Sequence, residues 1–210
     1  MKKIIIASVV SALLLSSCSS VQTVTKSLKA DYSEPKNAKR HTPQKLYVNA
    51  IGTQEMMKKD KNVILVDVRT PEEWHFVGYT KSAQIMIPGT FFDYSQMDTF
   101  QNKPRYMPVS NTKWISTFEE KIADLGYDED NTYVIMCRSG ATRAAPVAKM
   151  MDQYGYKKVY IMTDGFEGGK VKEGPKKGFR LKNGWKNSGS SWTYKIDPKK
   201  VYFKKYGVSL

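Results

Sequence analysis

From residue 46 onward, the chain alternates between short apolar runs and longer segments with helical spacing of apolar residues. Four runs rich in β-branched residues predict strands that are buried on both faces, at 63–66, 85–87, 133–136 and 159–162. The apolar spacing over 114–125 and 144–154 predicts helices, which Gly126 and Gly155 are placed to end. Alternating strands and helices predict an α/β domain with a parallel sheet covered on both faces. In such sheets, ligands bind beyond the carboxyl ends of the strands.

The N-terminal segment has the pattern of an export signal. Lys2 and Lys3 precede an apolar run over 4–15, which is too short to span a bilayer core of about 30 Å but has the usual length of a signal-peptide core. The small residues before Cys18 resemble the lipobox of bacterial lipoproteins. This resemblance implies a signal peptide over 1–17 and lipidation of Cys18, whose acyl chains would anchor the protein to a membrane. The alternative is an ordinary secretory signal with an incidental cysteine.

Residues 18–45 are rich in Ser, Thr, Lys, Asn and Pro and show no apolar period. Such a composition predicts a flexible tether between the lipid and the domain. We therefore expect a lipid-anchored protein of the bacterial cell envelope that faces the periplasm. Whether it is held by the inner or the outer membrane stays open.

The net charge of +14 is concentrated towards the C-terminus. Residues 46–156 hold 12 basic and 14 acidic side chains, whereas residues 157–210 hold 14 basic and 4 acidic ones. Basic and aromatic residues alternate over 193–210, which can indicate contact with RNA or with anionic lipids. For an exported lipoprotein we expect no nucleic-acid partner, and packing of this segment on the domain is favoured over membrane contact. Two cysteines and two histidines that lie far apart predict neither a metal site nor a bound cofactor.

The strongest candidate for chemistry is the loop over 137–143, where a predicted strand runs directly into a predicted helix. Cys137 at its start would face backbone N–H groups and the positive end of the helix dipole, beside Arg138 and Arg143. All these features favour a thiolate, so we expect Cys137 to be a nucleophile. Gly140 supplies the permissive backbone that a loop around an anion needs. A buried structural cysteine is the alternative, but arginines and a glycine are poor neighbours for one.

Three motifs, in this order, resemble the signatures of a rhodanese domain. They are Val-Asp-Val-Arg-Thr-Pro-Glu-Glu-Trp at 66–74 with Ile-Pro at 87–88, Cys-Arg-Ser-Gly at 137–140, and Asp-Gly-Phe-Glu-Gly at 164–168. The resemblance covers residues 46–168 and resumes near Gly184 and Trp185. It implies a single rhodanese-like domain with a five-stranded, mostly parallel sheet.

The resemblance also implies a sulfurtransferase. An anionic donor such as thiosulfate would pass a sulfur atom to Cys137, and the persulfide would pass it to cyanide, a thiol or a protein acceptor. Loop residues that would bind the substrate are Arg138, Ser139, Gly140, Ala141, Thr142 and Arg143. Asp67 and Arg69 resemble the structural pair of the family, with Glu72 or Glu73 as further partners of Arg69.

The loop departs from the common rhodanese pattern, because Thr142 takes its sixth position and Arg143 follows one residue later. The spacing from Cys137 to Arg143 resembles that of cysteine-dependent phosphatases, which enclose phosphate or arsenate. Ala144 lacks the hydroxyl that many of these enzymes place after the arginine, so sulfur transfer is favoured over phosphoester hydrolysis. A non-catalytic rhodanese-like binding module is a third reading, although such modules commonly lack the cysteine.

Residues 169–183 form an apparent insertion with six basic residues and one acidic residue. Because the strand before it should neighbour the strand that bears Cys137, we expect the insertion at the rim of the site. There it would attract anionic donors. A solvated loop with no specific role is the alternative. The domain then ends over 184–210 with the basic and aromatic extension.

Overall fold

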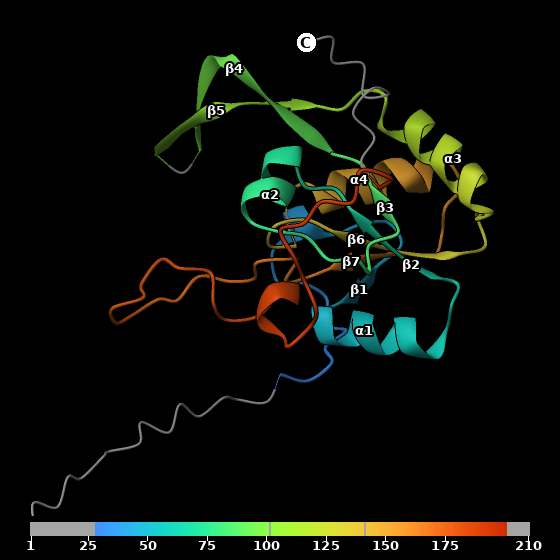
Figure 1. The fold of residues 1–210 in the computed structure, drawn as a ribbon, viewed down its shortest axis with the longest axis horizontal. Coiled ribbons are helices and arrows are strands. Elements are labelled where there is room, and N and C mark those ends of the chain that lie inside the picture. Colours follow the sequence, from blue (N-terminus) through green and yellow to red (C-terminus); the bar gives the residue numbers. More distant parts are fainter. Residues whose placement is uncertain (1–27, 101, 141, 201–210) are drawn as a thin grey trace, which may run out of the picture.

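A five-stranded parallel sheet lies at the centre of the computed structural model, which describes residues 28–100, 102–140 and 142–200 (Figure 1). The strand order is β1-β7-β6-β2-β3. The strands are β1 (Leu46–Val48), β2 (Val63–Asp67), β3 (Ile85–Met86), β6 (Thr132–Met136) and β7 (Val159–Met162). The predicted fold class and the predicted strands are confirmed. The expected signal peptide, the lipidated Cys18 and the last ten residues lie outside the described residues.

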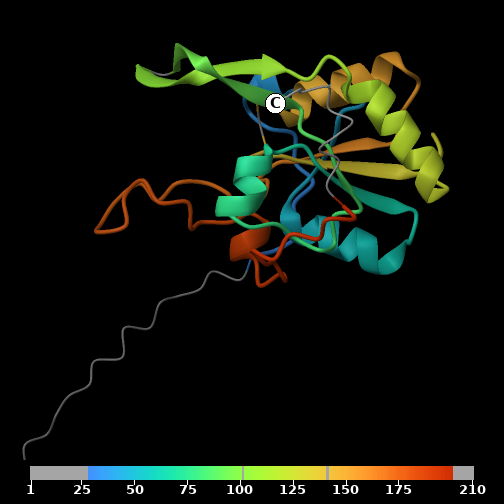
Figure 2. The ribbon, with the colours of Figure 1, turned by 45° about the horizontal axis from the view of Figure 1, so that its top comes forward.

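Helices cover both faces of this sheet (Figures 1 and 2). They are α1 (Ala50–Lys59), α2 (Pro71–Phe76), α3 (Trp114–Leu125) and α4 (Ala144–Gln153). Side chains of α3 and α4 pack with Ile64 and Val66 of β2, whereas Trp74 of α2 packs with Val63 and Leu65 on the opposite face. All five residues of β2 are buried, as the continuous apolar run predicts.

Local sequence signals account for the ends of the helices. Gly126 ends α3 in the left-handed conformation with φ 71°, which glycine adopts without a steric penalty. The helix α2 was not predicted, although Thr70 and Glu73 form a capping box around Pro71 at its start. All three residues belong to the motif at 66–74, and the helix that they begin is only six residues long.

A two-stranded antiparallel ribbon extends from the domain beyond the end of β3 and was also not predicted (Figures 1 and 2). It consists of β4 (Thr90–Phe100) and β5 (Lys103–Ser110). Two prolines interrupt β5, and the register shifts between Asp93 and Met97, so the period of two is broken. Proline is tolerated here because a two-stranded ribbon has only edge strands.

The described chain before β1 contacts the domain at several residues between Lys29 and Thr42. Asn49 donates from its backbone N–H to Asp31 O over 2.8 Å and from its side chain to Lys29 O over 2.7 Å. Thr42 is buried, and its backbone N–H donates to the Tyr47 hydroxyl over 3.1 Å. The backbone groups of Lys29, Asp31 and Thr42 thus find their hydrogen-bond partners in the domain.

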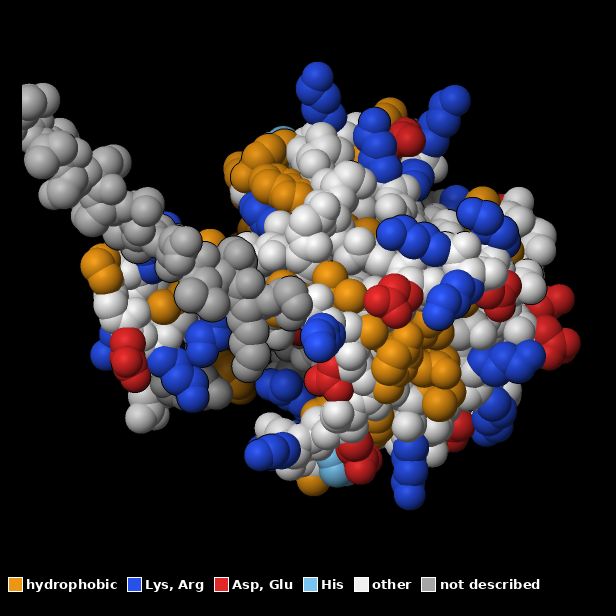
Figure 3. All heavy atoms as spheres, turned by 90° about the horizontal axis from the view of Figure 1, so that it is seen from below, with side chains coloured by type: hydrophobic (Ala, Val, Ile, Leu, Met, Phe, Trp, Pro, Cys, Tyr) orange, Lys and Arg blue, Asp and Glu red, His pale blue; other side chains and the backbone are white. Residues whose placement is uncertain are grey.

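The C-terminal segment packs on the domain as far as it is described, as expected. Thr193 pairs with Tyr79 through two backbone hydrogen bonds, and the Lys200 ammonium donates to the carbonyls of Lys81 and Ala83. Basic side chains are spread over the surface seen in Figure 3, with acidic ones between them. Within the described ranges, no helix combines the length and the apolar character that crossing a membrane requires.

Candidate active site

Cys137 is the first residue after β6, which lies between β7 and β2 in the sheet. Its position is therefore the carboxyl end of an interior strand, where ligands of parallel sheets bind. The residue is a free cysteine with only 2% of its surface exposed. Its backbone contacts the turn after β7, where the Phe166 N–H donates to Cys137 O over 2.8 Å.

Two glycines allow the loop after Cys137 to contact the turn after β7. Gly140 has φ 70°, and a Cβ atom there would lie 2.2 Å from the carbonyl carbon and oxygen of Thr163. Gly165 has φ 62°, and a Cβ atom there would lie 2.4 Å from Cys137 O and 2.7 Å from Ser139 N. Both positions require glycine on two grounds, the left-handed backbone and the absence of space.

The loop retains backbone donors for a ligand. The N–H groups of Arg138, Ser139 and Gly140 donate no hydrogen bond to any other described residue. Consecutive N–H groups of this kind can form an anion-binding concavity, and here they directly follow Cys137 in the chain. Ala141, which was predicted to belong to the same set, lies outside the described residues.

Asp67 and Arg69 form an ion pair beneath this loop. The Arg69 Nη2 to Asp67 Oδ2 distance is 2.7 Å, and both side chains are fully buried. The Arg69 guanidinium also stacks on the Phe166 ring at 3.8 Å from its centre. Asp67 lies beside Met136 in the register of β2 and β6, so the pair supports the residue just before Cys137.

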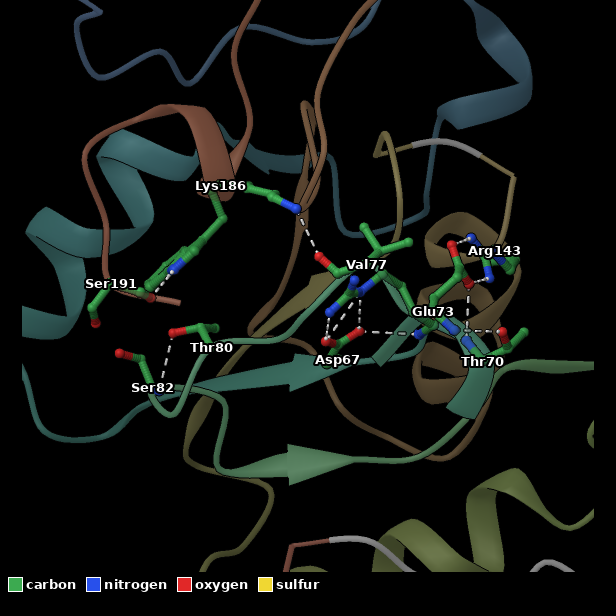
Figure 4. A network of polar contacts seen from close by, with 11 residues as sticks. Asp67, Thr70, Glu73, Val77, Thr80, Ser82, Arg143, Lys186 and Ser191 are labelled. Carbon is green, nitrogen blue, oxygen red and sulfur yellow. Dashed lines mark hydrogen bonds and ion pairs between the residues drawn. The ribbon is translucent and has the colours of Figure 1, made fainter. Parts of the chain in front are cut away.

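We expected Glu72 or Glu73 of α2 to form an ion pair with Arg69, but each of these carboxylates binds a different residue. Glu73 forms a two-pronged ion pair with Arg143, in which Arg143 Nη2 donates to Glu73 Oε1 over 2.8 Å (Figure 4). Glu72 instead accepts a hydrogen bond from the Tyr94 hydroxyl of β4 over 2.6 Å. Asp67 accepts from Nε and Nη2 of Arg69, whereas the start of α4 brings Arg143 against Glu73 of α2.

This ion pair shifts the ionisation of both partners. Burial alone would raise the pKa of Glu73, but the hydrogen bond and the charge of Arg143 lower it to about 2. Burial alone would lower the pKa of Arg143, but Glu73 raises it above its ordinary value. The side chains are only 14% and 15% exposed, so solvent screens the attraction weakly.

Replacing Glu73 with glutamine is expected to remove an acid-sensitive part of the stability. The pKa of Glu73 falls from 4.5 to about 2 on folding, so its contribution is complete above about pH 4.5 and is lost as the pH falls towards 2. The shift corresponds to about 3 kcal/mol of unfolding free energy. Urea denaturation across this pH range should show a flatter dependence in Glu73→Gln, whereas the exposed Glu55→Gln should retain the wild-type slope. An unchanged slope in Glu73→Gln would contradict the role of the pair.

The comparisons with known proteins agree with this geometry. The Rhodanese-like domain family matches residues 52–172, which is more than half of the chain. The chain belongs to the rhodanese-like domain family. This membership confirms the interpretation of the sequence motifs and accounts for a cysteine loop at the end of a central parallel strand.

The names of two similar proteins state no activity. "Uncharacterized protein RP600" of Rickettsia prowazekii is 30% identical over 144 residues, which cover 66% of this chain and 89% of the relative. "Uncharacterized protein RC0915" of Rickettsia conorii is 29% identical over 141 residues, covering 67% and 90%. The crystal structure of Rv0390 from M. tuberculosis matches with a TM-score of 0.52 and 22% identity, over 70% of this chain and 96% of that one, which supports the fold.

Other polar residues of this rhodanese-like domain hold the site in place. Arg138 forms an ion pair with Glu167, and the N–H of Glu167 donates to Arg138 O over 2.9 Å. Asp164 is buried, and its two carboxylate oxygens accept the N–H groups of Ala50 and Gly184. Burial raises the pKa of Asp164, and these two N–H groups oppose the shift. Asp164 thus joins the start of α1 to the end of the 169–183 segment, a role that its place in a family motif did not reveal.

Proposed function

We propose that this protein is a sulfurtransferase that carries sulfane sulfur as a persulfide on Cys137. The observation that carries the proposal is the position of Cys137 at the end of β6, followed directly by three loop N–H groups that donate to no other described residue. The thiolate attacks the outer sulfur of thiosulfate, the bond between the two sulfurs breaks, and sulfite leaves with its electron pair. The persulfide is then Cys–S–S⁻, and its negative charge lies where the N–H groups can stabilise it.

In the second step a thiophilic acceptor takes the outer sulfur. With cyanide, the carbon attacks that sulfur, thiocyanate forms and the Cys137 thiolate returns. No general base is required when the thiol is already ionised, so the scarcity of histidine in the sequence is no objection. Cys18 is the only other cysteine of the chain, so an external thiol or a protein is the proposed physiological acceptor.

The contacts of Arg143 favour sulfur transfer over phosphoester hydrolysis. A phosphatase of the spacing Cys137 to Arg143 would direct the arginine fork at the phosphate. Here both terminal nitrogens of Arg143 pair with Glu73 instead. The intact cysteine loop likewise favours catalysis over a purely binding role.

The proposed location follows from the sequence alone. The apolar run over 4–15 and the lipobox-like segment before Cys18 support export and lipidation. We therefore place the activity at the periplasmic side of a bacterial membrane. Globomycin treatment of cells, which blocks lipoprotein signal cleavage, should cause an unprocessed precursor to accumulate; an unaffected mature form would contradict this location.

The test of the activity is intact-mass measurement of the purified protein after incubation with thiosulfate. We expect a gain of one sulfur atom, assigned by peptide mapping to Cys137, and its loss on addition of cyanide with release of thiocyanate. A parallel assay with p-nitrophenyl phosphate serves as the comparison. Phosphatase turnover without the sulfur adduct would overturn the proposal, and the absence of both signals would favour a binding module.

A further inference from the structure

The segment over 169–183 is a hairpin that begins and ends at the edge of the candidate active site. Val171 and Phe179 are joined by a backbone hydrogen bond of 2.8 Å, and Lys170 pairs with Arg180 in antiparallel fashion. The hairpin projects to the same side of the domain as the β4–β5 ribbon (Figures 1 and 2). Its outer residues, 172–179, are exposed, whereas Arg180 at its base is partly buried.

Contacts at the base of the hairpin hold Arg180 in place. Arg180 Nη1 donates to the carbonyl of Gly168 over 2.6 Å, and the Asn187 side chain donates to Arg180 O over 3.3 Å. Gly168 follows Glu167, the partner of Arg138, so the Arg180 side chain crosses towards the Cys137 loop. The arrangement joins the hairpin to the 164–168 motif, whose Phe166 and Glu167 N–H groups bind the carbonyls of Cys137 and Arg138.

Most of the donor capacity of Arg180 is unused. A guanidinium carries five N–H groups, and only one of those of Arg180 donates to another described residue. Its Nε atom is buried and has no hydrogen-bond partner in the described part of the chain. Burying such a donor without a partner is costly, so the position indicates a ligand that supplies acceptors.

The charges around Cys137 are also incompletely matched. Glu167 pairs with Arg138 and Glu73 pairs with Arg143, whereas Arg180 forms no ion pair with a described carboxylate. Burial and the like charge of Arg138 lower the pKa of Arg180, while Glu167 and Cys137 oppose this shift. Arg180 therefore lies against the turn whose Phe166 and Glu167 N–H groups bind the carbonyls of Cys137 and Arg138, and it pairs with no carboxylate among the described residues.

We propose that Arg180 binds the anionic oxygens of the sulfur donor at the mouth of the Cys137 loop, opposite the backbone N–H groups. The inference rests on the proposed function for the identity of the donor, a sulfonate-bearing anion such as thiosulfate. In this arrangement the outer sulfur of the donor faces Cys137 while its oxygens accept from the Arg180 guanidinium. Arg180 acts by binding and placing the donor and takes no proton or sulfur itself.

The test compares Arg180→Gln and Arg180→Lys with Lys176→Gln, which removes the same charge from the exposed end of the same hairpin. In steady-state transfer from thiosulfate to cyanide, Arg180→Gln should raise the KM for thiosulfate about tenfold and change kcat less than about threefold. Arg180→Lys should recover part of this loss, and Lys176→Gln should stay near the wild type. The Arg180→Gln effect should persist at high salt, because a direct contact is screened less than long-range attraction.

A second readout does not depend on sulfur transfer. The rate of alkylation of Cys137 is measured with anionic iodoacetate and with neutral iodoacetamide in the full-length protein. Arg180→Gln should lower the ratio of the two rates about fivefold, and Lys176→Gln should leave it unchanged. A wild-type-like ratio and KM in Arg180→Gln would overturn the role of Arg180. If the wild type forms no persulfide but Arg180→Gln still lowers the ratio, the proposed function fails while the anion site stands.

Discussion

Replacing Cys137 with serine is expected to abolish the sulfur adduct and to lower thiocyanate formation by at least about 1,000-fold. A serine hydroxyl remains protonated at neutral pH and cannot form a persulfide. The substitution is nearly isosteric at a site that is 2% exposed, so the fold should be retained. Intact-mass measurement and the cyanide assay give the two readouts, and thermal denaturation monitors the fold.

The matched control for this variant is Cys18→Ser, which changes the only other cysteine of the chain. In purified, unlipidated protein, Cys18→Ser should transfer sulfur at the wild-type rate. Sulfur transfer that survives in Cys137→Ser would contradict the persulfide proposal. Loss of transfer in Cys18→Ser would indicate a relay between two thiols within the chain.

Replacing Gly140 with alanine is expected to have the second largest effect. The new Cβ atom would lie 2.2 Å from Thr163 and 2.3 Å from Met162 O, and all of these contacts are with the backbone at the end of β7. Backbone atoms of a central strand cannot move aside as the end of a flexible side chain can. Left-handed strain and overpacking together should cost about 4 kcal/mol, and displacement of the loop should lower kcat/KM at least about 100-fold.

Gly126→Ala separates the two causes, because Gly126 has nearly the same φ of 71° but no atom within 4 Å of its added Cβ. This variant should lose only about 1 kcal/mol and retain the wild-type rate of transfer. Urea denaturation and the cyanide assay are measured on both variants. Equal losses in the two proteins would show that backbone strain alone accounts for Gly140, and that close packing against β7 contributes nothing.

Elements whose signals are local were predictable from the sequence. The run over 63–66 is almost entirely apolar and β-branched because β2 lies inside the sheet, and the structure extends it by one residue to Asp67. Helix α3 has the predicted limits, since its apolar stripe faces the sheet and Gly126 follows its last residue. The Cys137 loop was found for the same reason, because a strand, a turn and a helix follow one another within about ten residues.

Elements that depend on distant partners were missed. The β4–β5 ribbon has two prolines and a shifted register, so each strand is defined by the other and not by its own period. Glu72 or Glu73 was expected to pair with Arg69, close by in the sequence, yet Glu73 pairs with Arg143, seventy residues away. Sequence distance favoured the first partner, whereas the packing of α4 beside α2 produced the second.

The sequence by itself determined the fold class, the central strands, the candidate cysteine and the division of the charge between a near-neutral core and a basic C-terminal part. Each of these is encoded by residue type and short-range spacing. Only the tertiary structure decided which guanidiniums near the Cys137 loop pair with a carboxylate and which one, among the described residues, does not. That choice depends on where α2, the turn after β7 and the 169–183 hairpin meet, because an ion pair forms between the side chains that the backbone brings within about 4 Å.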